Sequence, residues 1–172
     1  MATMTRAAAK ISGATKAIGK ALSGYPAIFR HLAGEHAEVA TLMKRVSASS
    51  DDTEIREQLF PEIRKNLLAH AKAEEKEFYE ALRTLPQTAS MIPQAVEEHR
   101  RIAKYLEQLQ RENCATDAWL DTFRAFESAV EAHVQREENE LFPASKDAFD
   151  SDRAKQIDER YEAAEEQEKA RI

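Results

Sequence analysis

Residues 130–138 read VEAHVQREE, so His133 is followed four positions later by Glu137. An α-helix turns about 100° per residue, and side chains four positions apart therefore share one face. The segment that begins at His70 has the same form, HAKAEE, with Glu74 in the matching place. Each segment predicts a helix that directs one imidazole and one carboxylate toward the same point.

Two further histidines, His36 and His99, lie among apolar residues at helical spacing but have no carboxylate four positions later. The four histidines follow one another along the chain as H, HxxxE, H, HxxxE. This order favours a pair of metal ions buried between four helices. His31 lies five residues before His36, or about 140° around a helix, and is predicted to be a surface or packing histidine.

Few helix-breaking residues interrupt the chain. Its 172 residues include 4 Gly and 5 Pro, with 42% hydrophobic and 33% charged residues, which is typical of one all-α domain. Short turns between consecutive long helices favour antiparallel neighbours. The predicted fold is an up-down-up-down four-helix bundle, preceded by an amphipathic N-terminal helix or arm and followed by a C-terminal outer helix.

Capping residues and prolines mark the predicted helix ends. The first bundle helix begins near Pro26, and Pro61 indicates either a kink in the second helix or a short helix before it. Pro143 is predicted to end the fourth helix. The remaining start signals are Asp51 or Asp52 for the second helix, Ile92-Pro93 for the third, Thr116 or Asp117 for the fourth, and Ser151-Asp152 for the outer helix.

Charge is distributed unevenly along the chain. Residues 1–34 contain no acid and carry +5, so with a net charge of -6 for the whole chain the remaining residues carry -11. We distinguish a basic amphipathic arm (1–24), the bundle (25–145) and a charged C-terminal helix (146–172). The arm is predicted to pack on the acidic bundle, with a membrane-surface or targeting role as the alternative. Residues 1–34 are also the candidate surface for a protein partner.

Several classes of protein do not fit the sequence. A net charge of -6 gives no reason to expect a nucleic-acid partner. No run approaches the ~18 apolar residues of a transmembrane helix, and the N-terminus lacks the apolar core of a secretory signal. Cys114 is the single cysteine and cannot form an intrachain disulfide. The predicted location is the cytoplasm.

The inward histidines and glutamates are expensive to bury unless they pair or bind metal. Imidazole and carboxylate ligands without a thiolate suit iron, manganese or zinc, and carboxylates that can bridge two ions favour a dinuclear site. The ExxH pairs of ferritin-like bundles are absent, because Leu67 and Val130 stand three residues before His70 and His133. The HExxH pattern of zinc proteases is absent as well.

The pattern resembles the hemerythrin family, in its bacterial form with an HHE cation-binding signature. The resemblance covers about residues 25–145 and is carried by Glu35-His36, the two HxxxE segments and Glu98-His99. It implies a cofactor of two non-heme iron ions, bridged by two carboxylates and an oxo or hydroxo group, with dioxygen binding at one iron.

The resemblance also implies which side chains hold the metal. In it, His36 and His70 bind one iron, His99 and His133 bind the other, and Glu74 and Glu137 bridge both. Glu138 is the alternative to Glu137, because oxygen-carrying members place this carboxylate one residue later. Glu75 is a weaker alternative to Glu74.

The chain departs from the oxygen-carrying pattern at Ala103, where those members have a histidine four residues after the one on the third helix. One iron then lacks a protein ligand. Water, another carboxylate or a tyrosine could replace it, and the sequence leaves Tyr25, Tyr79 and Tyr105 open.

Three functions follow from these observations. The leading hypothesis is a di-iron protein that binds or senses dioxygen or a related diatomic such as nitric oxide. The open position at Ala103 supports a second hypothesis, a di-iron redox enzyme for peroxide breakdown or ferroxidase activity, or an iron-sensing or storage protein. The third is a metal-free helical interaction module. The apolar surround expected to exclude water from a bound gas is formed by Phe78, Leu106, Phe126, Val130 and Val134.

Overall fold

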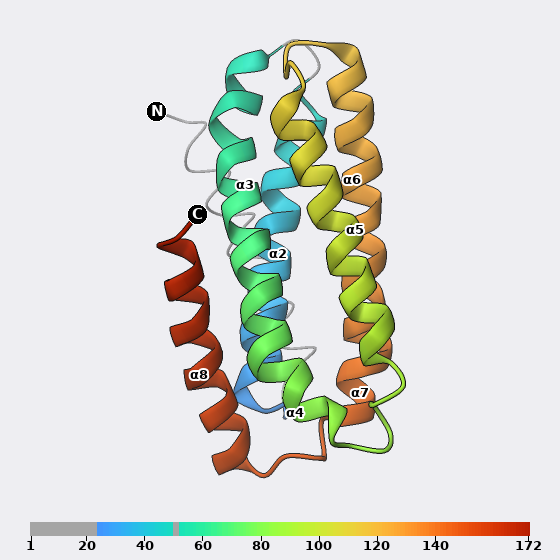
Figure 1. Ribbon diagram of the computed structural model, residues 1–172, viewed down its shortest axis with the longest axis vertical. Helices are drawn as coiled ribbons and strands as arrows, with labels where there is room; N and C mark the ends of the chain where they lie inside the picture. The colour runs from blue at the N-terminus through green and yellow to red at the C-terminus, as the bar shows by residue number, and fades with distance from the viewer. Residues whose placement is uncertain (1–23, 50–51) are drawn as a thin grey trace.

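The chain is a bundle of four long helices that run up, down, up and down (Figure 1). A computed structural model describes residues 24–49 and 52–172, and every element in these ranges is helical, which confirms the predicted all-α bundle. The predicted arm lies outside the described residues except for Gly24. The elements are α2 (Ala27–Ser47), α3 (Thr53–Ala73), η1 (Glu74–Phe78), α4 (Tyr79–Arg83), α5 (Ile92–Arg111), α6 (Asp117–Arg136), η2 (Glu137–Leu141), α7 (Phe142–Ser145) and α8 (Ser151–Lys169).

Side-chain caps begin three of the helices, because they accept a hydrogen bond from an amide of the first turn that has no partner within the helix. Asp52 accepts from the Ile55 amide at 3.2 Å, and Thr116 accepts from the Trp119 amide at 3.2 Å, as two of the predicted alternatives require. The expected cap of the outer helix was wrong by one residue. Asp150 is the cap, and Ser151 and Asp152 already belong to the first turn of α8.

The structure removes one of the two alternatives for Pro61 and contradicts the prediction for Pro143. Helix α3 is continuous with Pro61 inside it, so no separate short helix precedes it. Pro143 does not end the fourth helical path, which continues to Ser145. Pro143 lies in the first turn of α7, where a missing amide hydrogen costs little, and this position explains why the path continues.

Two apolar clusters fill the bundle, one at each end. The lower cluster in Figure 1 lies where α2 begins and where α4 and α7 lie, and the upper one surrounds Trp119 and Phe123. His36 falls between Ala33 of the first cluster and Val39 of the second. A polar layer therefore crosses the middle of the bundle and divides its core.

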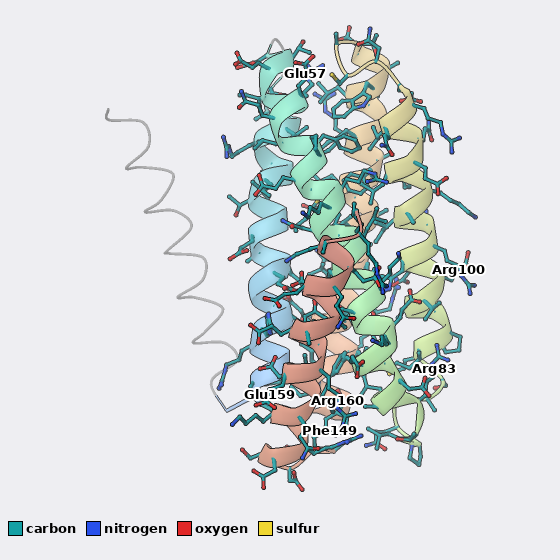
Figure 2. All side chains as sticks on the ribbon, turned by 60° about the vertical axis from the view of Figure 1, so that its left-hand side comes forward. Glu57, Arg83, Arg100, Phe149, Glu159 and Arg160 are labelled. Atoms are coloured by element: carbon teal, nitrogen blue, oxygen red, sulfur yellow. The ribbon has the colours of Figure 1, made fainter. Side chains whose placement is uncertain are left out.

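Helix α8 packs outside the bundle along α2 and α3 (Figures 1 and 2). Glu159 and Arg160 are exposed on it, and Figure 2 shows them on its outer side. Its inner face is a narrow row of buried residues, which are Ala154, Ile157, Tyr161, Ala164 and Glu165. Among the described residues, no helix is both long and apolar enough to cross a membrane.

Candidate metal centre

All six predicted site residues lie together in the polar layer. None of their side chains is more than marginally accessible, with exposed fractions between 0% for Glu74 and 7% for His36. The histidines come from the four bundle helices, and Glu74 and Glu137 are the first residues of η1 and η2. The six are His36, His70, Glu74, His99, His133 and Glu137.

Their ligand atoms form two groups of metal-binding geometry. Within each group the nitrogen and oxygen atoms lie within 4.8 Å of one another. One group is His36, His70 and Glu137, and the other is Glu74, His99 and His133.

Each inner carboxylate also lies between the two groups. The Oε2 of Glu74 is 3.4 Å from the Nε2 of both His70 and His99. The Oε2 of Glu137 is 3.4 Å from the Nε2 of His36 and 3.6 Å from that of His133. This placement suits carboxylates that bridge two ions.

The other ring nitrogen of every histidine contacts a second carboxylate, from a neighbouring helix. The Nδ1–H groups donate over 2.9 to 3.1 Å, each to one glutamate. The pairs are His70 with Glu35, His99 with Glu75, His133 with Glu98, and His36 with Glu138. We call these four glutamates the outer carboxylates. Each bundle helix gives one outer carboxylate and receives one, where η1 is counted with α3 and η2 with α6. The four contacts therefore form a closed ring.

The outer carboxylates fix the tautomer of each neutral imidazole. A carboxylate accepts a hydrogen bond from Nδ1–H, so the Nε2 of a neutral imidazole carries a lone pair that points into the layer. The Nε2 atoms of His99 and His133 lie 3.1 Å apart. Five inward acceptor atoms are buried without a hydrogen-bond partner, namely Nε2 of His36, Nε2 of His70, Oε1 and Oε2 of Glu74, and Oε2 of Glu137. Native proteins rarely leave such atoms unpaired. A cation is the partner that this donor set lacks, and histidine nitrogen with carboxylate oxygen suits iron, manganese or zinc.

Without a metal ion, the pKa values of the buried groups in the layer are shifted in both directions. Burial lowers the pKa of His70, but Glu74 and Glu35 outweigh it and hold this pKa well above its ordinary value. Burial and then the charge of Glu74 raise the pKa of the Glu137 carboxyl well above the ordinary range. Burial lowers the pKa of His133, and the neighbouring His99 lowers it further. A metal ion would displace the bound protons, so binding is expected to release acid.

A π-helical turn follows each HxxxE segment. The chain winds as HAKAEEKEFY through η1 and as HVQREENELF through η2, with the inner glutamate as the first residue of each turn. Such turns commonly occur at functional sites. The site residues of the first hairpin recur 63 positions later in the second. His99 is 63 residues after His36, and His133 is 63 residues after His70. The layer is thus built by two equivalent helical hairpins.

Two tyrosines reach the layer, and they break this equivalence. The Tyr79 hydroxyl donates to Oε1 of Glu137 at 2.7 Å, and its ring stacks on His99. Phe142 occupies the equivalent place beside His36 and has no hydroxyl. Tyr161, which the sequence did not reveal as a site residue, enters from α8.

The other tyrosines proposed as replacements for the missing histidine lie in different surroundings. Tyr25 packs edge-on against Phe29, and Tyr105 lies beneath the guanidinium of Arg101. Tyr79 is therefore the one of the three whose contacts place it in the layer. Ala103 itself is half-buried on α5.

A pattern in the sequence could have identified the outer carboxylates, because each belongs to a doublet, a pair of adjacent site residues. The doublets are Glu35-His36, Glu74-Glu75, Glu98-His99 and Glu137-Glu138. In each doublet one residue faces the layer and its neighbour faces a histidine of the next helix. Glu138 and Glu75, the alternative bridging residues, lie on Nδ1 of His36 and His99.

His31 lies at the outer edge of the site rather than inside it. Its Nδ1 is 2.8 Å from Asp158 of α8, and its Nε2 is 3.5 Å from Glu35. The hydrogen bond to Glu35 is the largest influence on its pKa, and despite partial burial the pKa is raised to about 9. His31 therefore links α2 to α8 as a cation, in agreement with its predicted place outside the ligand set.

A cavity leads to the His36 and His70 side of the layer. It has a volume of about 40 Å³ and passes Val130 and Val134 under the edge of α8. A second hollow of about 210 Å³ reaches His36 from between α2 and α6. Since about 10–15 Å³ of such volume holds one water molecule, a diatomic molecule fits the first cavity.

Comparison with known proteins agrees with this geometry. The family described as "Hemerythrin HHE cation binding domain" matches residues 27–145. A curated protein named "DNA nickase", from Nostoc sp. (strain PCC 7120 / SAG 25.82 / UTEX 2576), is 28% identical over 130 residues, which are 76% of this chain and 36% of the nickase. The chain thus spans about a third of that relative's length. No solved structure matches the chain.

Proposed function

This chain belongs to the hemerythrin HHE cation-binding domain family, and from that membership we propose that its polar layer holds two non-heme iron ions and binds or senses dioxygen or nitric oxide. The observation that carries the proposal is the convergence of five buried, unpartnered acceptor atoms in two ligand groups. Glu74 and Glu137 are proposed to bridge the ions, because each lies between histidines of both groups.

The protein's contribution is to fix and shield this centre. Bound iron would supply reversible binding of a diatomic ligand. The outer carboxylates keep each Nε2 directed inward, and the Tyr79 hydroxyl holds one oxygen of Glu137 and leaves the other free. Val130 and Val134 line the cavity beside His36 and limit the water that reaches it.

Metal content and absorption test the proposal. Protein from iron-supplemented cells is expected to contain two irons per chain and to show iron charge-transfer absorption that changes when the reduced protein meets oxygen. The His99→Ala variant should lose iron, whereas Arg100→Ala, at the exposed neighbouring position (Figure 2), should keep it. A chain that carries no metal and is not stabilised by added iron would contradict the proposal and favour the metal-free interaction module.

The position of Ala103 favours one alternative, a di-iron redox enzyme. Its methyl group offers no ligand where a histidine would complete the coordination of the His99 and His133 ion. An open position at that ion would admit peroxide, or ferrous iron in a ferroxidase or iron-storage reaction. Oxygen evolution from peroxide faster than that of free iron, lost in His99→Ala, would support this alternative over reversible ligand binding.

The likeness to a DNA nickase defines a separate assay. The predicted absence of a nucleic-acid partner rests on the net charge of -6 and remains a prediction. Incubation with supercoiled plasmid and manganese or ferrous iron is expected to leave the plasmid intact beyond the metal-only control. Nicked circles that depend on the protein and disappear in Glu74→Gln would instead assign nicking to this centre.

A further inference from the structure

We propose that Tyr161 is a positioning residue of the metal centre. Metal binding at the half of the site that contains His36 and His70 therefore depends on helix α8. The inference rests on the proposed metal site and adds a determinant from outside the family match, which ends at residue 145. It predicts that the two halves bind metal with unequal dependence on α8.

The contacts of Tyr161 form a closed triangle with two site residues. Its hydroxyl donates to Oε2 of Glu35 at 2.5 Å and lies 2.8 Å from Nδ1 of His70. The third side is the hydrogen bond from His70 Nδ1 to the same Glu35 oxygen, at 2.9 Å. The tyrosine side chain is fully buried, so its hydroxyl is shielded from bulk water.

The equivalent place in the second half is built differently. Glu98, which supports His133, is paired with Arg136 of α6, inside the bundle. Within residues 24–49 and 52–172, no arginine is paired with Glu35, which is instead held by Tyr161 and His31. The half that contains His70 thus depends on a helix that is added to the bundle, whereas the half that contains His133 is complete within it.

Two polar contacts of α8 hold Tyr161 in register. Asp158, three residues before it, bonds to His31 of α2. Lys72 Nζ, two residues after His70, donates to Glu168 near the end of α8 at 3.0 Å. These contacts lie before and after Tyr161 along α8, so the helix is fixed at a position that keeps the hydroxyl against Glu35.

The hydroxyl acts on the metal through Glu35 and His70. An imidazole binds a cation with one nitrogen while the group on its other nitrogen sets its orientation and basicity. Loss of such an outer partner costs about 10- to 100-fold in metal affinity. Removal of the Tyr161 hydroxyl should therefore weaken binding at His36 and His70 and leave binding at His99 and His133 unchanged.

Titration of the full metal-free chain with Co²⁺ tests this, because the visible spectrum of Co²⁺ reports its coordination. Tyr161→Phe removes the hydroxyl and keeps the ring. Ile157→Val is the matched control, since it loosens the packing of α8 and leaves the hydroxyl in place. His70→Ala, alone and combined with Tyr161→Phe, shows whether the effect passes through His70.

The wild-type chain is expected to bind two Co²⁺ ions. In Tyr161→Phe one of them should bind at least about tenfold more weakly, with an altered spectrum, while Ile157→Val matches the wild type. In the His70→Ala background the hydroxyl should make no further difference. Equal affinities in Tyr161→Phe and wild type, or the same loss in Ile157→Val, would overturn the role of Tyr161 and leave the metal site standing. A wild-type chain that binds no Co²⁺ would overturn both proposals.

Discussion

Each inward histidine uses its two ring nitrogens for different tasks. Nδ1 donates to an outer carboxylate, and Nε2 faces the inner carboxylates. The glutamate doublets divide in the same way. Glu137 is 2% exposed and lies between two histidines, whereas the neighbouring Glu138 is partly exposed and contacts the Nδ1 of His36. Adjacent and chemically identical residues therefore have unequal roles.

This difference predicts unequal effects of the same substitution. Glu137→Ala removes a proposed bridging carboxylate and should abolish binding of at least one of the two ions. Glu138→Ala removes only the partner of Nδ1 and should weaken binding by about 10- to 100-fold. Metal content after gel filtration, with affinities from competition with a chelator, measures both. Loss of metal in Glu138→Ala with full retention in Glu137→Ala would reverse the assignment.

Helical periodicity was sufficient to place the six inner residues on inward faces, because spacing along one helix is a local property, and their role as metal ligands stays a prediction. Periodicity was not sufficient for the outer carboxylates. Glu35 supports a histidine on α3 and Glu138 supports one on α2, and the rotation of one helix against another is not encoded in the periodicity of either. Tyr161 was missed for the same reason, since in the sequence it is one apolar residue of a weak stripe.

At the scale of helices, the π-turns place the two glutamate doublets. A π-turn accommodates one residue more than an α-turn. The helical residues before and after it therefore direct the same face toward the bundle interior. Glu74 can then face the layer while Glu75 reaches the next helix. Helical periodicity does not predict this widening, so each segment was predicted as a plain α-helix.

Deletion of one residue tests this interpretation. Without the exposed Lys76 of η1, the π-turn should become an α-turn, and the bundle should fold but bind metal weakly. Deletion of the exposed Lys65 in the regular part of α3 rotates all that follows by about 100° and should prevent folding. Circular dichroism melting and metal content distinguish the two. Equal loss of folding in both variants would contradict the interpretation.

The link between α2 and α8 gives a pH dependence with a defined sign. The hydrogen bond to Glu35, with that to Asp158, raises the pKa of His31 from 6.5 to about 9 in the folded chain. The folded state thus binds the proton more tightly than the unfolded state, and the stabilisation is fully present below about pH 6.5. It is lost as the pH rises through about 9.

Urea unfolding of the metal-free protein measures this contribution. The wild type should exceed His31→Gln in stability near neutral pH, and the difference should shrink as the pH approaches the raised pKa. The comparison cancels titrations that both proteins share. A difference that stays constant across this range would show that His31 contributes by packing and not by its charge.

At the scale of the whole molecule, the polar layer is a cost to the bundle unless it is filled. It separates two apolar clusters and buries carboxylates and imidazoles in place of hydrocarbon. Burial of such groups without partners is unfavourable. Metal occupancy should therefore be a large part of the stability of the loaded protein.

Removal of the metal should lower the melting temperature. A site held at 100 times its Kd contributes about 2.7 kcal/mol, and about 1 kcal/mol corresponds to about 2–4 °C for a chain of this size. Each ion should thus account for about 5–10 °C. Calorimetry with and without a chelator checks this, with the double variant Glu74→Gln, Glu137→Gln, which alters both ligand groups, as the control that should not respond. A wild type that melts alike in both conditions would contradict it.

Each ligand group takes its two histidines from one helical hairpin and its glutamate from the other. His36 and His70 belong to α2 and α3 but meet Glu137 of η2, and His99 and His133 meet Glu74 of η1. A metal ion bound by either ligand group would therefore link the two hairpins. A single cut in the turn of residues 84–91 would leave two fragments, neither of which owns a complete ligand group. The two fragments would then reassociate only in proportion to the metal concentration, as the subunits of a metal-dependent dimer do.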